Sequence, residues 1–217
     1  MLTIEQNVSS ALHYIFINPI KDKMNKDIRY TLFIGVTLLM CVFTANAQKV
    51  AVKSNIPYWA TGISPNAALE FTLGKKATLE LGGGFNLWTF ENNKKVKHWL
   101  AQPELRYWFC ESFNGHFIGI HAHGVQYNVG GWDIPLGRLK TFKEHRYEGY
   151  LYGAGLSYGY QWVLSPRWNF ELSLGGGFAR IHYDKYPCVT CGAKVDEGDQ
   201  NYLGVTKAAI SLIYMIR

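Results

Sequence analysis

Sixteen consecutive residues, 149–164, alternate between two kinds of side chain. The even positions, from Tyr150 to Leu164, are mostly aromatic or aliphatic, whereas the odd positions, from Gly149 to Val163, are mostly glycine or small. A period of two indicates a β-strand, because successive side chains of a strand point to opposite faces. A strand of this length exceeds the roughly 3–10 residues that are usual in soluble sheets. The segment therefore predicts a long strand with one aromatic face and one glycine-rich face.

The same alternation recurs through most of the chain and predicts eight strands. Their approximate bounds are 49–57, 66–73, 77–89, 98–110, 116–129, 147–164, 168–183 and 202–216. Three predicted connections are short (74–76, 111–115 and 165–167), and four are longer (58–65, 90–97, 130–146 and 184–201). An even number of strands with short turns on one side and longer loops on the other is typical of outer-membrane barrels. The sequence therefore predicts an all-β fold, an eight-stranded antiparallel up-and-down transmembrane β-barrel.

The two faces of these strands distinguish a membrane barrel from a soluble one. One face is largely apolar, as at Leu105 and Tyr107, and charged residues occupy the other. A ring of about eight strands has room inside only for packed side chains, and an unpaired buried charge is costly. We therefore expect the charged face to form a paired ion network in the lumen, made of Lys53, Glu70, Glu80, Glu104, Arg106, Glu171 and Lys207. Two interpretations stay open: a salt-bridged plug that closes the barrel, and a small gated pore whose ion pairs rearrange.

Aromatic residues gather beside the short turns. Such residues are enriched where a membrane protein meets the membrane–water interface. We expect an aromatic girdle outside the barrel, made of Phe71, Trp108, Phe109, Phe117, Trp162 and Trp168.

The segment before the strands has the pattern of an export signal. Residues 31–45 form an apolar run that is shorter than the roughly 20 residues a membrane-spanning helix needs. Lys26 and Arg29 precede the run, and Ala45-Asn46-Ala47 follows it. This order predicts a signal peptide with cleavage after Ala47. Residues 1–47 are thus expected to be an N-terminal extension plus signal peptide, and residues 48–217 an outer-membrane β-barrel.

Two alternatives concern this leader. Translation can begin at Met1 or at Met24, since either would precede an acceptable signal. Cys41 is a candidate for lipidation, but Met40 occupies the position where a lipoprotein signal has a small residue. We therefore favour cleavage without lipidation.

His121 and His123 place two imidazoles on one strand face. Together with a carboxylate such as Glu104 they are weak candidates for a zinc site. Hydrogen bonding to polar neighbours is the simpler interpretation, and no metal or other cofactor is expected. A histidine paired with a serine would instead favour lipid hydrolysis, but no motif fixes such a pair and no catalytic residue is assigned.

Three cysteines lie within the predicted barrel. Cys188 and Cys191 share the last long connection, and in an oxidising compartment we expect them to form a loop disulfide. Cys110 lies at the end of its strand that is next to a short turn, a strand length away from the long connections. It is therefore too far from Cys188 and Cys191 to form a disulfide with either of them. We expect Cys110 to be free.

The charge balance of the chain is mildly basic. It holds 22 Lys and Arg against 16 Asp and Glu. Nucleic acid is not an expected partner of an exported protein, so the position of the cations matters more than their number. Several crowd two outer loops and are candidate contacts to phosphates or acidic sugars of surface glycolipid, namely Lys94, Lys95, Lys97, Arg138, Lys140, Lys143 and Arg146, with His98 and His145 beside them.

Several segments also carry a family resemblance. They are Gly74–Asn86, Gln102–Trp108, Gly115–Phe117 with His121–His123, and Asp184–Cys188. These motifs resemble a family of small Bacteroidetes-type outer-membrane β-barrel proteins that is filed as a domain of unknown function. The resemblance covers essentially all of residues 48–217. It implies the barrel and outer-membrane localisation, brings no catalytic residues, and points to a fimbrial or other cell-surface protein as a partner.

Three functions follow in order of preference. The first is a non-enzymatic barrel with a structural or surface-interaction role, a closed lumen and functional outer loops, working as a monomer among outer-membrane lipid and lipopolysaccharide. The second is an outer-membrane enzyme that modifies lipid or lipopolysaccharide. The third is a small gated channel.

Overall fold

The computed structural model describes residues 49–60, 64–90, 94–131, 145–187 and 192–216. The predicted signal peptide, including Cys41, lies outside these ranges and stays a prediction. The elements are β1 (Val50–Asn55), α4 (Ile56–Ala60), β2 (Asn66–Gly74), β3 (Ala77–Asn86), β4 (Lys95–Trp108), β5 (Gly115–Gly130), β6 (Arg146–Val163), β7 (Trp168–Tyr186) and β8 (Asp196–Met215). Within the described ranges, none of the helical structure is long and apolar enough to cross a membrane.

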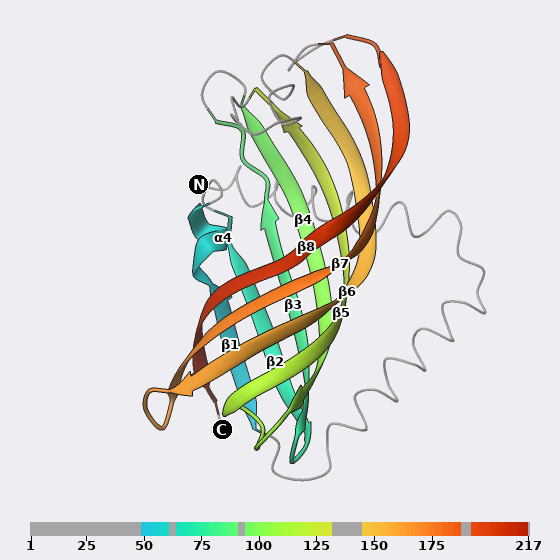
Figure 1. Ribbon diagram of the computed structural model, residues 1–217. Helices are drawn as coiled ribbons and strands as arrows, with labels where there is room; N and C mark the ends of the chain where they lie inside the picture. The colour runs from blue at the N-terminus through green and yellow to red at the C-terminus, as the bar shows by residue number, and fades with distance from the viewer. Residues whose placement is uncertain (1–48, 61–63, 91–93, 132–144, 188–191, 217) are drawn as a thin grey trace, which may run out of the picture. The chain divides into compact units, whose positions relative to one another are not determined.

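The eight strands close into a ring. Each strand pairs antiparallel with the next along the chain, and β1 pairs with β8 to complete a closed barrel (Figure 1). Closure gives every strand two hydrogen-bonded neighbours, which removes the exposed edges that open sheets must protect. The predicted all-β fold of eight antiparallel strands is therefore confirmed.

The ring has two unlike ends. The short connections after β2, β4 and β6 lie at one end, which we call the turn end, and the longer connections lie at the other, the loop end (Figure 1). At the turn end, Ser112 ties two neighbouring turns together, because its hydroxyl donates to the carbonyl of Gly74 at 2.9 Å. Phe113 has a φ of 69° in the same turn and is only 3% exposed. Since this backbone conformation is costly for a residue with a side chain, packing of its ring against the base of the interior holds it there.

Some predicted boundaries were wrong at the loop end. The connection predicted at 184–201 begins and ends in strand, at residues 184–186 and 196–201, because β7 and β8 stay paired as far as Lys185 and Asp196. Polar residues occupy both faces there, so the alternation that marks a half-buried strand is lost while the backbone pairing continues. The first connection also holds the short helix α4, where the sequence predicted a strand to residue 57 followed by a loop.

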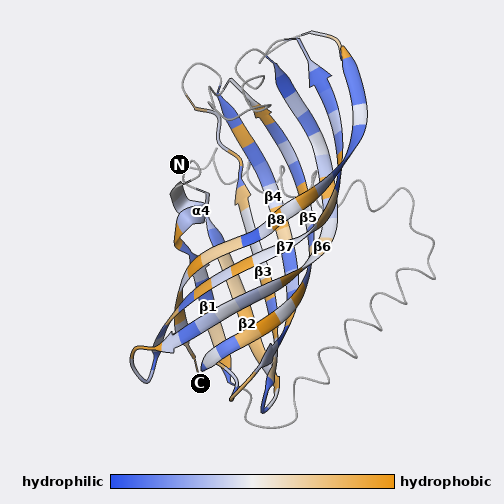
Figure 2. Ribbon diagram, viewed as in Figure 1, coloured by the Kyte–Doolittle hydropathy of each residue, from blue (hydrophilic) through white to orange (hydrophobic). Residues whose placement is uncertain are grey.

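The outward face of the ring is apolar near the turn end. Figure 2 shows hydrophobic residues alternating along this part of the strands, whereas hydrophilic residues prevail at the loop ends of β6, β7 and β8. Outward side chains that are largely exposed include Leu69, Leu81, Leu105, Ile120, Leu156, Leu172, Leu174 and Leu212. The buried side chains at the same level are mostly polar or charged. The ring is therefore apolar outside and polar inside, the reverse of a soluble barrel.

Candidate functional site

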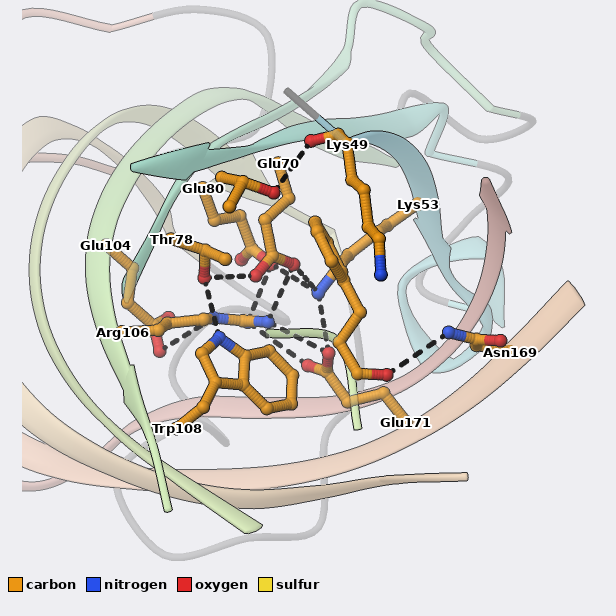
Figure 3. A network of polar contacts seen from close by, with 12 residues as sticks. Lys49, Lys53, Glu70, Thr78, Glu80, Glu104, Arg106, Trp108, Asn169 and Glu171 are labelled. Carbon is orange, nitrogen blue, oxygen red and sulfur yellow. Dashed lines mark hydrogen bonds and ion pairs between the residues drawn. The ribbon is translucent and has the colours of Figure 1, made fainter. Parts of the chain in front are cut away.

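Four glutamates and three cations meet inside the ring. They are the residues of the expected ion network (Lys53, Glu70, Glu80, Glu104, Arg106, Glu171 and Lys207), each of them 8% exposed or less. Arg106 forms ion pairs with all four glutamates, at nitrogen–oxygen distances of 2.6–3.2 Å. Lys53 contacts Glu171 at 2.6 Å and Glu80 at 3.1 Å, and it also pairs with Glu70. Figure 3 shows Lys53, Arg106 and the four glutamates, and Lys207 joins them through Glu80 and Glu104, so the structure brings all seven together.

Strand register explains why the carboxylates cluster. Glu70 lies opposite Glu80 in the β2–β3 pair, and Glu80 lies opposite Glu104 in the β3–β4 pair. Like charges directly opposite each other destabilise a sheet, so this row requires cations nearby. Lys207 supplies one from β8, because its ammonium pairs with Glu104 and lies 2.8 Å from Glu80. When every group is ionised, the network holds four negative and three positive charges.

Neutral side chains complete the coordination of the network. The hydroxyl of Ser157 donates to Glu104 at 2.6 Å, and that of Thr78 donates to Glu70. Thr78 in turn accepts from the indole N–H of Trp108 at 2.9 Å. The sequence alone does not indicate that Thr78 contacts Glu70, because this contact depends on how β2 and β3 pair.

An aromatic layer closes the interior below the network, toward the turn end. We call Trp108, Phe113, Phe117 and Ile213 the base plug; each is 3% exposed or less. The rings of Trp108 and Phe117 lie 4.8 Å apart, and the guanidinium of Arg106 lies 4.4 Å from the centre of the Phe117 ring. The expectation that Trp108 and Phe117 belong to an outer girdle was therefore wrong. Both share the parity of inward residues on their strands, and nearness to a turn does not change parity.

Glycines make room for these large side chains. A Cβ on Gly119 would overlap the carboxylate of Glu104 and would lie 2.5 Å from the hydroxyl of Ser157. A Cβ on Gly159 would overlap the ring of Phe117. Gly119 on β5 and the glycine-rich inner face of β6 are thus required by the bulk that neighbouring side chains occupy in a narrow lumen.

A β-bulge adds one residue that the sequence parity placed elsewhere. The register of β7 with β8 shifts between Gly175 and Gly176, so Gly175 pairs with Lys207 and Gly176 with Val205. The extra residue, Thr206, turns inward, and its hydroxyl lies 2.9 Å from Nε2 of His121. An extra residue of this kind re-aims a neighbouring side chain, and here it places Thr206 and Lys207 on the same side of the sheet.

Above the network, toward the loop end, the interior is open. A cavity of about 400 Å³, which we call the vestibule, is lined by Asn55, Tyr58, Leu100, Gln102, His123, Val125, Leu151, Ala179, Ile181, Tyr202, Val205, Thr206, Lys207, Ala208 and Ala209. A smaller cavity of about 70 Å³ shares Tyr58 and Lys207 with it and reaches Glu80. Tyr58 extends from α4 into this region, where its hydroxyl lies 2.5 Å from Nε2 of His98. His98 therefore faces the interior, whereas the sequence suggested a place among the cations of the rim.

The two histidines predicted as weak metal candidates lie side by side. The ring centres of His121 and His123 are 5.8 Å apart, and both side chains are buried. Within the described ranges, the group of three candidate ligands with mutually close donor atoms is Glu70, Glu80 and Glu171, not the histidines with Glu104. Lys53 and Arg106 already neutralise those glutamates. This donor set is therefore an ion-pair network rather than a metal centre.

The remaining predicted sites lie at the two ends. Lys95 and Lys97 pair with Gly130 and Asn128 at the loop end of β4, and Lys94 precedes them. Arg146 lies over the ring of Tyr186 at 4.3 Å and 2.9 Å from Glu148. Arg138, Lys140, Lys143, Cys188 and Cys191 lie outside the described residues, so the loop disulfide stays a prediction. Cys110 is free and exposed, as expected.

Comparison with known protein families identifies the family of the chain. Residues 33–216 match a family described as "Protein of unknown function (DUF3575)". The chain belongs to this family. The search of curated proteins finds no match. Membership in an uncharacterised family, expected from the motifs, is therefore confirmed, and the match brings no activity with it.

Proposed function

We propose that the protein is a non-enzymatic outer-membrane β-barrel that presents its loop end to a partner at the cell surface. The observation that carries this proposal is the inverted ring, with an ion network inside and an apolar surface outside. In water this surface would be a large exposed patch, of the kind that marks an interaction site or a membrane contact. Against lipid it is the expected exterior.

The height of the apolar surface matches a membrane. On β7 the outward residues run from Trp168 through Leu172 and Leu174 to Phe178, a span of ten residue steps. At about 3.3 Å per residue this is roughly 33 Å along the strand. With the tilt of about 40° that is usual for such barrels, the height is roughly 25 Å, which equals the apolar band of outer-membrane barrels.

Polar groups mark the upper limit of this band. Beyond Phe178 the next outward residues of β7 are Arg180 and His182, and both pair with Asp199 of β8 at 2.8–2.9 Å. At the lower limit, Trp168 packs against Tyr214 with ring centres 5.1 Å apart, and Trp162 is 41% exposed. An aromatic belt at one boundary and charges at the other support insertion with the loop end in the headgroup region or beyond.

The base plug and ion network argue against a channel. Eight strands leave little lumen, and the side chains of Arg106, Trp108 and Phe117 fill it at the level of the membrane band. Purified protein in planar bilayers is therefore expected to give no conductance steps between pH 5 and 8. Regular steps at low voltage would favour the gated pore instead.

One contact favours an enzyme as the second candidate. Thr206 and His121 have the spacing of a nucleophile and a base, at 2.9 Å. However, Nδ1 of His121 is buried without a hydrogen-bond partner in the described structure, so no carboxylate orients the ring. A working pair normally has such a third group. Substitution of Thr206→Val is expected to leave the lipid A and phospholipid composition of the cell unchanged, and an altered composition would support the enzyme.

The surface role is tested by crosslinking in intact cells. The loop-end parts of β6, β7 and β8, residues 146–150, 180–186 and 196–201, form a wall beyond the apolar band (Figure 1). We expect a cell-surface protein to bind this wall, with rim cations such as Lys95 and Lys97 contacting glycolipid phosphates. Arg180→Glu should weaken recovery of the crosslinked partner, whereas Arg167→Glu at the turn end should not. Equal recovery with both variants would contradict the assignment.

Localisation is tested separately. The chain should fractionate with the outer membrane, and an unboiled sample should migrate differently from a boiled one on a denaturing gel. Recovery from the soluble periplasm with identical migration would overturn the membrane assignment.

A further inference from the structure

The vestibule has a floor and walls of different chemistry. Its walls carry aliphatic side chains from five strands, among them Leu100, Val125, Leu151 and Ile181. Its floor is polar and includes Gln102, His123, Thr206 and Lys207. Concave sites of about 300–1,000 Å³ that combine apolar walls with a few polar groups are typical of small-molecule binding. A volume of about 400 Å³ falls within this range.

One polar group on the floor is not used by the protein. His123 is 7% exposed, and its Nδ1 atom is buried with no hydrogen-bond partner in the described structure. A buried polar atom without a hydrogen-bond partner destabilises the folded protein unless a ligand supplies that partner. His121, its neighbour, is held by Thr206, but nothing corresponding holds His123. His123 lines the vestibule, so rotation of its ring would present this unpaired nitrogen to the head of a ligand in the cavity.

The charges below the floor limit what this head can be. The one ammonium on the floor, that of Lys207, is already paired with Glu80 and Glu104. The ion network holds one more carboxylate than it has cations, so an anionic head group would enter a region of negative potential. A neutral hydroxyl avoids this repulsion, and it can donate to or accept from an imidazole nitrogen in either tautomer.

We propose that the vestibule binds a neutral single-chain amphiphile, with the chain against the aliphatic walls and the hydroxylated head at His123. Scaling from the cavity of about 150 Å³ that holds benzene, the space suits a chain on the order of a dozen carbon atoms. A monoacylglycerol has this chemistry. The site goes beyond the surface role proposed above and depends only on the inside of the ring.

The test uses the purified mature protein, residues 48–217, in phosphatidylcholine nanodiscs. The probe is a photoactivatable 1-lauroylglycerol that carries a diazirine in its chain. Mass spectrometry should find label on the inward residues Val125, Leu151 and Ile181. This labelling should saturate and should be displaced by unlabelled lauroylglycerol. Lauric acid at pH 8 should compete at least fivefold more weakly, because its head is ionised. Label confined to outward residues such as Ile120 and Leu156 would overturn the proposal.

Two pairs of variants make the test specific. Leu151→Trp fills the vestibule and should lower saturable labelling at least fivefold, whereas Leu156→Trp, on the outer face of the same strand, should change it less than twofold. His123→Leu should weaken binding about two- to tenfold, the usual worth of a net hydrogen bond, and His182→Leu on the outside should not. Unchanged binding in both Leu151→Trp and His123→Leu would overturn the site. Gel migration of each variant reports whether the ring forms, so failure of the ligand site is distinct from failure of the barrel.

Discussion

The two halves of the lumen differ in how densely they are packed and in the side chains that line them. In the half near the turn end, Arg106 and its glutamates are closely packed, with a small cavity of about 70 Å³ reaching Glu80, and Trp108 and Phe117 close the base. In the half near the loop end, the same strands line an open vestibule with Leu151 and Ile181. The charged half of the lumen is therefore the closely packed one, and the half with aliphatic walls encloses the larger cavity.

Strand β5 shows how one strand serves both halves. Its inward residues run from Phe117 in the base plug, through His121 beside the network, to Val125 in the wall of the vestibule. The change happens within eight residues. The charged half is therefore expected to account for stability and the open half for binding, and variants in the two halves should have separable effects.

The largest effect is expected from removing the central cation. Arg106→Met leaves four buried glutamates with two lysines, and breaking a buried charge network in this way typically costs about 3–5 kcal/mol. The free energy of unfolding should fall by about this amount in urea titrations of protein refolded into lipid vesicles. Arg167→Met, at an exposed turn, should change it by less than about 0.5 kcal/mol. Equal effects of the two variants would contradict the idea that stability resides in the charged half.

The next effect is expected from filling the space that glycine leaves. In Gly119→Ala the new methyl group would overlap the carboxylate of Glu104, and overpacking of this kind costs about 1–3 kcal/mol. Gly124→Ala on the same strand is the matched control, because a Cβ there meets nothing within 4 Å. The same urea titration distinguishes them. If Gly119→Ala were as stable as Gly124→Ala, the interior would be looser than described.

The smallest effect is expected at the loop-end parts of β7 and β8, where charged side chains pair on the outside of the ring. A hydrogen bond from Arg180, then one from His182, holds the pKa of Asp199 below its ordinary value of 3.8. A carboxyl group whose pKa is lower in the folded state stabilises that state above its unfolded pKa, and this contribution is lost as the pH falls through the folded pKa. An NMR titration of the Asp199 carboxyl carbon should therefore have a midpoint below 3.8. In Arg180→Gln the midpoint should rise, and an unchanged midpoint would mean that the pair does not persist in solution.

Most of what the sequence predicts correctly follows from residue parity, that is, from whether a residue occupies an odd or an even position along its strand. A strand with period two assigns each side chain to a face, so Glu104 and Arg106 could be placed inside without knowing their partners. Parity also places Trp108 inside, with Arg106, whereas its position next to a turn favours an outer girdle; parity holds because the backbone geometry of a strand fixes it. The correct interpretation was available from the sequence.

Other features of the structure are not indicated by any pattern in the nearby sequence. The bulge at Thr206 adds one residue, and nothing in the residues around it marks the register of its neighbour β7. The helix α4 spans only five residues, too few for a helical period to show. The pairing of Lys185 with Asp196 lies where both faces are polar. These are consequences of strand pairing and tertiary packing, which a single sequence does not contain.

The inverted ring in a membrane is tested most directly by measuring whether each face of the ring contacts lipid or water. In a variant with its four cysteines replaced by serine, a single cysteine at Leu156, Leu174 or Ile181 would carry a small fluorophore in protein reconstituted into lipid vesicles. Labels at the outward positions 156 and 174 should be quenched by nitroxide-bearing lipid and not by acrylamide, a neutral quencher dissolved in the water. The label at position 181, inside the vestibule, should be quenched by acrylamide and not by the lipid. Outward labels quenched by acrylamide alone would contradict a membrane-embedded barrel with an inverted interior.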